Sequence, residues 1–289
     1  MRFAYYPGCS LHSTAKEYDV SMRAVAGEVG VELVEIPDWN CCGASSAHVT
    51  DSFLGFALPA RTLAQADEMG LDVLAPCAAC YGRLMAAKDE ARRHPDLARR
   101  FGDVTGRVFK LERRVLNVLE FLTGDGMAEA VAAGVKKGLD GLKVAPYYGC
   151  LLVRPPKVTR FDNAERPVAM DRVLEAIGAS AVDFPFKTEC CGASLGISRT
   201  DLVTELSARI VESAKRAGAE ALAVACPLCQ TNLDARQGAA AASRGESFGL
   251  PVYYITQLVG LALGVAPGKL GFSRLLVEPM TLLREKKLA

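Results

Sequence analysis

Cysteine is the residue whose spacing indicates chemistry in this chain of 289 residues. Two copies of one pattern each contain a single cysteine, an adjacent Cys-Cys pair followed by glycine, and a Cys-x-x-Cys pair. The copies are Cys9, Cys41, Cys42, Cys77 and Cys80, and then Cys150, Cys190, Cys191, Cys226 and Cys229. In both, the adjacent pair ends 35 residues before the Cys-x-x-Cys begins. All ten cysteines belong to this pattern, although free cysteine also packs well in cores. The sequence therefore indicates two sites of five sulfurs each.

Four kinds of chemistry use cysteines in such numbers, and five sulfurs per site help to separate them. Structural disulfides are unnecessary in a chain with a large core and are rare where thiols stay reduced. A thioredoxin-like dithiol explains one Cys-x-x-Cys but leaves three cysteines per copy unused. Zinc takes four ligands, one fewer than each copy offers, although zinc in one half stays an alternative. An iron–sulfur cluster is favoured. An ordinary cubane also takes four cysteines, so the fifth indicates an unusual cluster or a sulfur kept free to react.

Composition and charge narrow the class of protein. The net charge is +1 and half of the residues are hydrophobic. The basic residues are scattered, so nothing indicates a nucleic-acid partner. The first residues lack the apolar core of a signal peptide, and no stretch approaches the roughly 18–20 apolar residues of a membrane span. We therefore expect a cytoplasmic protein whose thiols are reduced.

Each cysteine group directly follows a predicted strand. We expect strands at residues 2–6, 32–36, 71–75 and 107–111, and at residues 143–148, 181–184, 221–225 and 252–255. We expect helices at residues 14–29, 52–69, 115–122, 167–177, 200–216 and 257–263, with another starting at each Cys-x-x-Cys. Such alternation predicts an α/β fold with mainly parallel sheets, although the strand order is not determined. Ligands of such folds bind beyond the carboxyl ends of the strands, where the five sulfurs of a half would converge.

The repeat also predicts the domain organisation. We expect an N-terminal domain at residues 1–123, a linker with a short Ala-rich helix at 124–141, and a C-terminal domain at 142–289. The two domains would be duplicated halves related by a pseudo-two-fold axis.

Candidates for chemistry beyond the cysteines are few. His12 and His48 follow cysteines closely and could protonate a leaving thiolate, although each could equally be an ordinary surface histidine. His94 lies in a charged run, where we expect it to be solvated. Three basic residues could bind an acidic substrate group, and two tyrosines are expected to pack beside the sulfurs. These are Lys187, Arg154 and Arg199, and then Tyr6 and Tyr148.

The cysteine arrangement resembles the duplicated cysteine-rich (CCG) domain of the heterodisulfide reductase B-subunit. The resemblance runs from Tyr5 to about Gln237 and includes residues 38–43 and 225–230 around the cysteine pairs. Some methanogen members carry proline where this chain has Gly43, and the Ala- and Arg-rich composition looks more like that of a bacterial heterodisulfide reductase-like member. The fold that the resemblance implies is a pair of Rossmann-like α/β halves.

The resemblance implies an oxidoreductase that acts on sulfur groups. Two noncubane [4Fe–4S] clusters would each be held by the five cysteines of one half, and a disulfide or heterodisulfide would be reduced, or reversibly formed, between them. Electrons would come from the ferredoxin-like C-subunit of heterodisulfide reductase, served by the flavin-containing A-subunit. The chain has no GxGxxG motif after a strand, which agrees with a need for an electron partner. The alternative is an electron-relay or sulfur-handling component of a sulfur-oxidising heterodisulfide reductase-like complex that acts on lipoate-bound sulfur.

Overall fold

Two parallel sheets of four strands organise the chain. The computed structural model describes residues 1–124, 126–245 and 248–289, apart from the side chains of Ser194 and Ser243. Asp125, in the expected linker, lies outside the described residues. The strand orders are β2-β1-β3-β4 and β6-β5-β7-β8. The bounds are β1 (Arg2–Tyr5), β2 (Glu32–Glu35), β3 (Val73–Leu74), β4 (Val115–Leu116), β5 (Lys143–Tyr147), β6 (Ser180–Ala181), β7 (Ala221–Val224) and β8 (Val252–Tyr254). The shared order confirms two duplicated Rossmann-like α/β halves.

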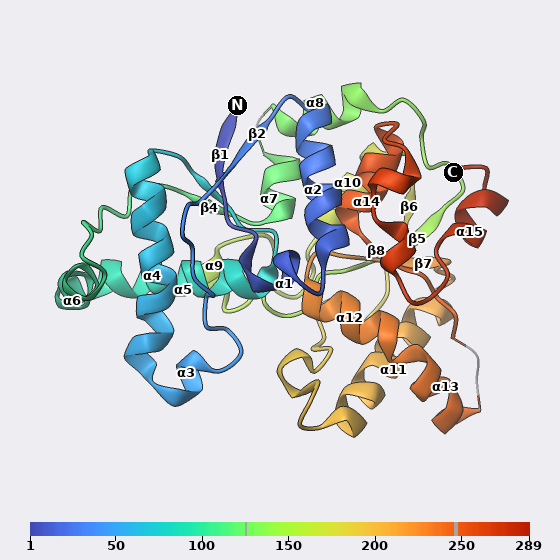
Figure 1. Ribbon diagram of the computed structural model, residues 1–289. Helices are drawn as coiled ribbons and strands as arrows, with labels where there is room; N and C mark the ends of the chain where they lie inside the picture. The colour runs from blue at the N-terminus through green and yellow to red at the C-terminus, as the bar shows by residue number, and fades with distance from the viewer. Residues whose placement is uncertain (125, 246–247) are drawn as a thin grey trace.

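Helices connect the strands in the same sequence in both halves (Figure 1). In the first half they are α1 (Gly8–His12), α2 (Lys16–Glu28), α3 (Ala47–Thr50), α4 (Ser52–Met69), α5 (Ala78–Arg93), α6 (Pro95–Thr105), α7 (Val118–Thr123) and α8 (Met127–Gly134). In the second half they are α9 (Pro156–Thr159), α10 (Ala169–Ala176), α11 (Thr200–Arg216), α12 (Pro227–Ala235), α13 (Gln237–Arg244), α14 (Ile255–Ala262) and α15 (Met280–Glu285).

The central strands of each sheet are short and buried. β1 pairs with β2 on one side and with β3 on the other, all in parallel. Right-handed crossovers therefore place α2 on one face of the sheet and α4 and α5 on the opposite face, as Figure 1 shows. Both faces of β3 and β7 are covered, which explains why the sequences of these strands are unbroken apolar runs.

One predicted strand is wrong. Residues 107–111 form no strand; the fourth strand is β4, and the helix after it begins only at Val118. The amides of Lys110, Leu111 and Arg113 donate to the carboxylate of Asp67, at 3.1, 2.9 and 3.4 Å. A side chain therefore satisfies the backbone groups that a neighbouring strand would otherwise pair. The sequence prediction also missed α6, which has proline at its first position and ends at Gly106.

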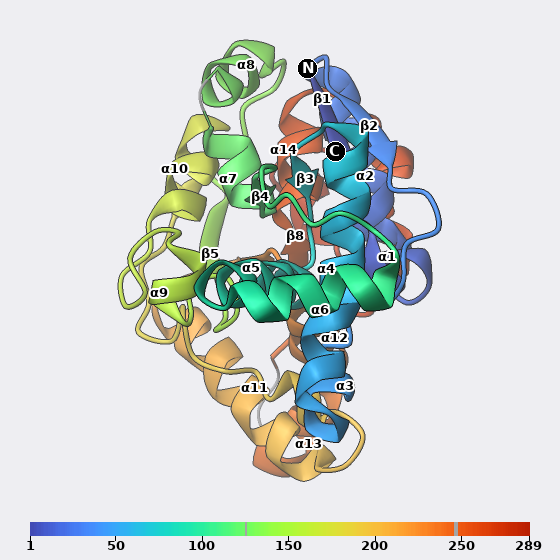
Figure 2. The same ribbon diagram turned by 90° about the vertical axis from the view of Figure 1, so that its left-hand side faces the viewer.

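The two halves contact each other through their cores. Helix α2 packs against α14, and the rings of Tyr18 and Tyr254 stack with centroids 4.1 Å apart. The hydroxyls of Ser21 and Thr256 form a buried hydrogen bond of 2.7 Å. Figure 2 shows a second contact, where α9 lies against α5 of the other half. The halves therefore share one continuous hydrophobic core.

Candidate functional site

Every cysteine group lies just beyond the carboxyl end of a strand. Cys9 lies in α1 directly after β1, and each Cys-x-x-Cys spans the start of a helix, α5 or α12. Two glycines make room for sulfur next to the single cysteines. A Cβ on Gly8 would lie 2.8 Å from Cys80 Sγ, and one on Gly149 would lie 3.0 Å from Cys229 Sγ. Both glycines have φ of +65°, a conformation that other residues rarely adopt.

Sulfurs of the same set lie close together in each half. Cys9 and Cys41 lie 3.8 Å apart at Sγ, and Cys42 and Cys80 lie 3.4 Å apart. In the second half, Cys191 and Cys229 lie 3.7 Å apart. Cys226 raises the pKa of Cys77, and Cys229 and Cys77 lower the pKa of Cys226, so the two sets influence each other's ionisation across the boundary of the halves. All ten cysteines are free thiols. The structure therefore brings sulfurs of each set together in pairs within its own half.

The two sets are exposed in the same way. In each, the single cysteine and the first of the adjacent pair are accessible, and the other three cysteines are buried. The accessible members are Cys9, Cys41, Cys150 and Cys190, of which Cys150 is half-buried. Each set therefore has a side open to solvent, whereas Cys77 and Cys226 are buried.

The protein environment stabilises thiolates in both sets. Hydrogen bonds with Cys41 and Cys80 lower the pKa of Cys42 to about 3, against the opposing effect of burial. A hydrogen bond with Cys150 lowers the pKa of Cys190 to about 6, and the amide of Gly192 donates to the Cys190 sulfur at 3.3 Å. Low pKa values of this kind are typical of cysteines that bind metal or react, because the thiolate is the ligand and the nucleophile.

A positive charge faces the first set, and a neutral amide faces the second. The charge of Arg83 helps to lower the pKa of Cys42. The Asn232 amide donates to the Cys191 carbonyl at 3.3 Å and to its sulfur at 3.6 Å. Each of these residues comes three positions after the last cysteine of its set, one helical turn along α5 or α12. Sequence reasoning missed both, although the shared spacing from Cys-x-x-Cys is a signal that could have found them.

The donor set can be compared with the ligand needs of a metal. Within the described residues, no three His, Cys, Asp or Glu side chains are grouped closely enough to hold one metal ion. The sulfurs instead form pairs spread over each half, with backbone amides directed at Cys41 and Cys190. Thiolates together with amide donors to sulfur are the environment that proteins give to iron–sulfur clusters. The donor types, cysteine sulfurs with amide N–H groups directed at them, therefore fit an iron–sulfur cofactor.

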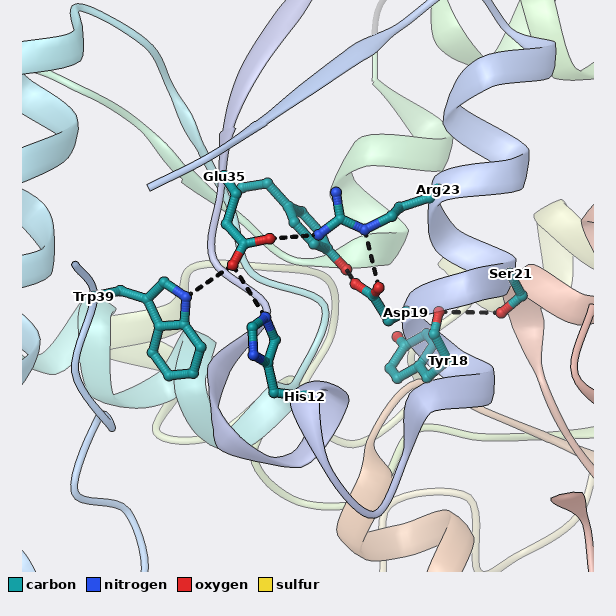
Figure 3. A network of polar contacts seen from close by, with 8 residues as sticks. His12, Tyr18, Asp19, Ser21, Arg23, Glu35 and Trp39 are labelled. Atoms are coloured by element: carbon teal, nitrogen blue, oxygen red, sulfur yellow. Dashed lines mark hydrogen bonds and ion pairs between the residues drawn. The ribbon is translucent and has the colours of Figure 1, made fainter. Parts of the chain in front are cut away.

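His12 belongs to a polar network beside the first set (Figure 3). Its Nε2 lies 3.0 Å from Glu35 Oε1, and the Trp39 indole donates to the same oxygen at 3.1 Å. Arg23 connects Glu35 to Asp19 through hydrogen bonds of 2.7 and 2.9 Å. Although burial alone would raise it, the pKa of Glu35 is lowered by the hydrogen bonds from Trp39 and Arg23. The network holds the His12 ring at the accessible side of the set, three residues after Cys9.

Three other predicted residues are exposed or lie in ion pairs. His48 is exposed on α3. His94 links α5 to α6 and is more than half exposed, as expected of a solvated residue. Lys187 is buried and pairs with Asp171 and Asp183 at 2.9 and 3.1 Å.

The two arginine candidates also have protein partners. Arg154 donates to the Thr188 carbonyl at 2.9 Å and pairs with Glu165 at the same distance. Arg199 pairs with Asp201 at 2.8 Å on the surface. Their guanidinium groups are therefore engaged by the chain itself.

One tyrosine prediction needs correction. Tyr6 does pack beside the first set, where burial and Cys80 raise its pKa well above the ordinary value. In the second half that position belongs to Tyr147, whose hydroxyl donates to the Glu189 carbonyl at 2.6 Å. Tyr148 points instead to Asp171, at 2.6 Å. Tyr6 and Tyr147 each precede their glycine by two residues, so counting from the glycine would have identified the pair.

Two α/β halves with five thiols at their strand ends define a cysteine-rich redox protein. The chain belongs to the cysteine-rich domain (CCG) family, whose model matches residues 3–85 and 144–234. Each match covers one complete five-cysteine set.

Curated relatives align over nearly the whole chain. The chain is 34% identical over 277 residues to the 8-methylmenaquinol:fumarate reductase membrane anchor subunit of Wolinella succinogenes, which covers 96% of this chain and 97% of the relative. It is 29% identical over 279 residues to the B-subunit of the ferredoxin/F(420)H(2)-dependent CoB-CoM heterodisulfide reductase of Methanosarcina acetivorans, covering 94% and 93%. The corresponding figures for the B-subunit of the ferredoxin:CoB-CoM heterodisulfide reductase of Methanosarcina mazei are 29%, 96% and 94%. The family is thus a cysteine-rich one, and these relatives are named as subunits of reductases.

A solved structure shares the fold. A crystal structure of a hypothetical protein from Helicobacter pylori matches with a TM-score of 0.76 at 14% identity. The match covers 96% of this chain and 52% of the other, so this chain spans about half the length of that protein. At this identity the likeness shows the fold alone. Among the helices that the structure describes, none has both the length and the apolar character needed to cross a bilayer.

Proposed function

We propose that the chain is the B-subunit of a heterodisulfide reductase-like complex, in which a disulfide is reduced or reversibly formed between two noncubane [4Fe–4S] clusters. The observation that carries this proposal is a complete five-thiol set at the strand ends of each half, with sulfur pairs 3.4 to 3.8 Å apart. Full-length similarity to proteins named as the B-subunit of heterodisulfide reductases supports it.

Each half would hold one cluster through its own five cysteines. When bound, the clusters would supply electrons to the two sulfurs of the substrate. Cleavage of a disulfide takes up two electrons and two protons and yields two thiols. The sulfur sets are accessible at the side of Cys9, Cys41 and Cys190, so the substrate would approach from there. The electrons would come from a ferredoxin-like C-subunit, served by a flavin-containing A-subunit.

The protons are the part of this reaction that side chains must supply. His12 is half exposed, lies near Cys9 and is held by Glu35, so it is the best-placed proton donor in the first half. His48 is exposed on α3 and is a second candidate. Lys187 is buried between two carboxylates, and its carbonyl accepts the amides of Tyr148 and Gly149. Its role is therefore to fix the loop before Cys150.

Anaerobic purification followed by metal analysis tests the proposal. The wild-type chain should carry about eight irons, four for each [4Fe–4S] cluster. Cys42→Ser and Cys191→Ser should each lose about half of the iron, because each removes a ligand from one set. The loaded protein should reduce a disulfide with an artificial electron donor. Iron near zero, with one or two zinc ions in its place, would contradict the proposal.

A second candidate function is electron relay in a quinol-dependent reductase. The observation that favours it is the 34% identity to a component of 8-methylmenaquinol:fumarate reductase, over nearly the full length of both chains. This function predicts the same iron content but a different reaction. The loaded chain would exchange electrons with a menaquinol analogue and would leave disulfides intact. Parallel assays with the two substrate classes on the same preparation therefore separate the candidates.

A further inference from the structure

We infer that the two halves have unequal reduction potentials, and that Arg83 makes the N-terminal half the stronger electron acceptor. The inference rests on the proposed iron–sulfur function and adds an order in which the two halves receive electrons. Its starting point is the matched pair Arg83 and Asn232. These residues occupy the same position, one helical turn after the last cysteine of Cys-x-x-Cys, and the Asn232 amide donates to the Cys191 sulfur at 3.6 Å.

The Arg83 side chain is held in place by the protein, and one of its buried N–H donors has no acceptor within the described part of the chain. Its Nη2 donates to the carbonyl of Gly55, and its guanidinium lies over the Phe56 ring at 5.3 Å from the centroid. Its Nε–H is buried and has no hydrogen-bond partner among the described residues. Such buried donors are rare because an unmade hydrogen bond is costly. A sulfur of the cofactor bound by Cys42 would supply the missing acceptor.

The space beside Arg83 comes from a glycine of the first half, Gly55, whose counterpart in the second half is a valine. Gly55 is the fourth residue of α4, and a Cβ there would lie 2.9 Å from Arg83 Nη2 and 2.8 Å from the His48 Cα. The matching fourth residue of α11 is Val203. The first half therefore has room for the Arg83 guanidinium. In the second half, the larger Val203 is paired with the shorter Asn232.

A second charge difference acts in the same direction. The residue before the adjacent pair is Asn40 in the first half and Glu189 in the second. Glu189 is an exposed carboxylate directly adjacent to Cys190 in the chain. The first set thus faces an added positive charge and the second an added negative one. The potential of an iron–sulfur site rises with positive charge and with hydrogen bonds to its sulfurs. The first electron delivered by the partner should therefore settle in the N-terminal half and the second in the C-terminal half.

Redox titration of the loaded protein, followed by electron paramagnetic resonance, tests this order. The wild-type protein should show two separate reduction steps. Arg83→Asn gives the first half the residue of the second, so the higher step should shift down towards the lower one. Arg83→Lys keeps the charge and should retain most of the separation. Arg99→Asn removes an exposed arginine of α6 and should shift neither step.

Each outcome bears on the inference. A single step in the wild type, or an unchanged separation in Arg83→Asn with full iron content, overturns it. If Arg83→Asn fails to hold iron, the double variant Val203→Gly/Asn232→Arg decides, because it should raise the lower step; an unmoved step overturns the inference. A loaded protein with the expected steps but no disulfide reduction overturns only the proposed function. A wild-type chain without iron overturns both.

Discussion

At the scale of single residues, cysteines that match in sequence differ in their chemistry. Cys42 has a pKa lowered to about 3, whereas contacts with neighbouring thiols raise the pKa of Cys77 and Cys80 well above the ordinary value. These differences come from hydrogen bonds between thiols, from amides and from Arg83. The polar network of Glu35 and His12 adds an asymmetry, because the position corresponding to His12, three residues after Cys150, is the buried Val153.

The lowered pKa of Glu35 predicts a pH-dependent effect of Glu35→Gln. A carboxylate whose folded-state pKa lies below its ordinary 4.5 stabilises the protein above that pH, and the contribution is lost as the pH falls through the folded pKa. The variant should be less stable than wild type by up to about 1 kcal/mol at pH 7, since solvent screens this half-buried group. The deficit should begin to shrink as the pH falls below about 4.5 and should vanish once the pH is below the folded-state pKa.

Urea unfolding of the metal-free chain at several pH values measures this effect. Glu32→Gln is the matched control, because Glu32 lies on the same strand in an exposed pair with Arg2. Its stability should change by less than about 0.5 kcal/mol. Equal deficits for Glu35→Gln at neutral and acidic pH would contradict the prediction.

At the scale of elements, helices with clear ends were predicted well and the fourth strand of the first half was not. The predicted residues 52–69 and 200–216 coincide with α4 and α11. Gly70 ends α4 with φ of +66°, the left-handed conformation that glycine adopts readily. Residues 107–113 instead take their shape from Asp67, which lies some 40 residues earlier in the chain. A contact over that separation leaves no local periodicity.

Asp67→Ala should therefore destabilise the metal-free chain. The change leaves three backbone amides of residues 110–113 without their acceptor in a partly buried segment, where an unpaired amide costs free energy. We expect a loss of about 2 kcal/mol and faster hydrogen exchange at these amides. Asp67→Asn keeps one oxygen acceptor and should lose less. Asp103→Ala, on the exposed side of α6, serves as the control. Wild-type exchange rates in Asp67→Ala would refute this account of the segment.

At the scale of the whole molecule, the boundary between the halves is a packing interface, and across it Cys77 and Cys226 influence each other's pKa. Tyr18 and Tyr254 stack there, and burial raises the pKa of both well above the ordinary value, with Cys77 and Cys226 adding to the effect. The same interface contains the buried hydrogen bond between Ser21 and Thr256. Coupling between the halves should therefore affect the free energy of unfolding as well as the reduction potentials.

A double-mutant cycle of Tyr18→Leu and Tyr254→Leu measures this coupling in the metal-free chain. Stacked rings contribute about 0.5–1.5 kcal/mol beyond their buried area. The double variant should therefore lose about 1 kcal/mol less than the sum of the single losses. Tyr18→Leu combined with Phe53→Leu is the control; Phe53 packs on Phe101 within the first half, so its effect should be additive. A Tyr18–Tyr254 coupling indistinguishable from zero would contradict the packing role.

The sequence by itself determined the duplication, the α/β class and the assignment of ten cysteines to two sets. These properties are local, because strand and helix periodicity and cysteine spacing depend on residues that are near one another in the chain. The positions of the cysteines after strands also predicted their convergence, because parallel strands end at the same edge of a sheet.

Only the tertiary structure decided how the sets differ and how they meet. Packing between distant segments decides the strand order and the influence of Cys226 on Cys77. It also decides that Tyr147, rather than Tyr148, lies beside the second set. The partners of Arg83 and Asn232 are likewise visible only once α5 and α12 lie against their cysteine loops. The ten cysteines are equivalent in the sequence. The two sites differ in their charge environment because the fold brings different residues to each sulfur.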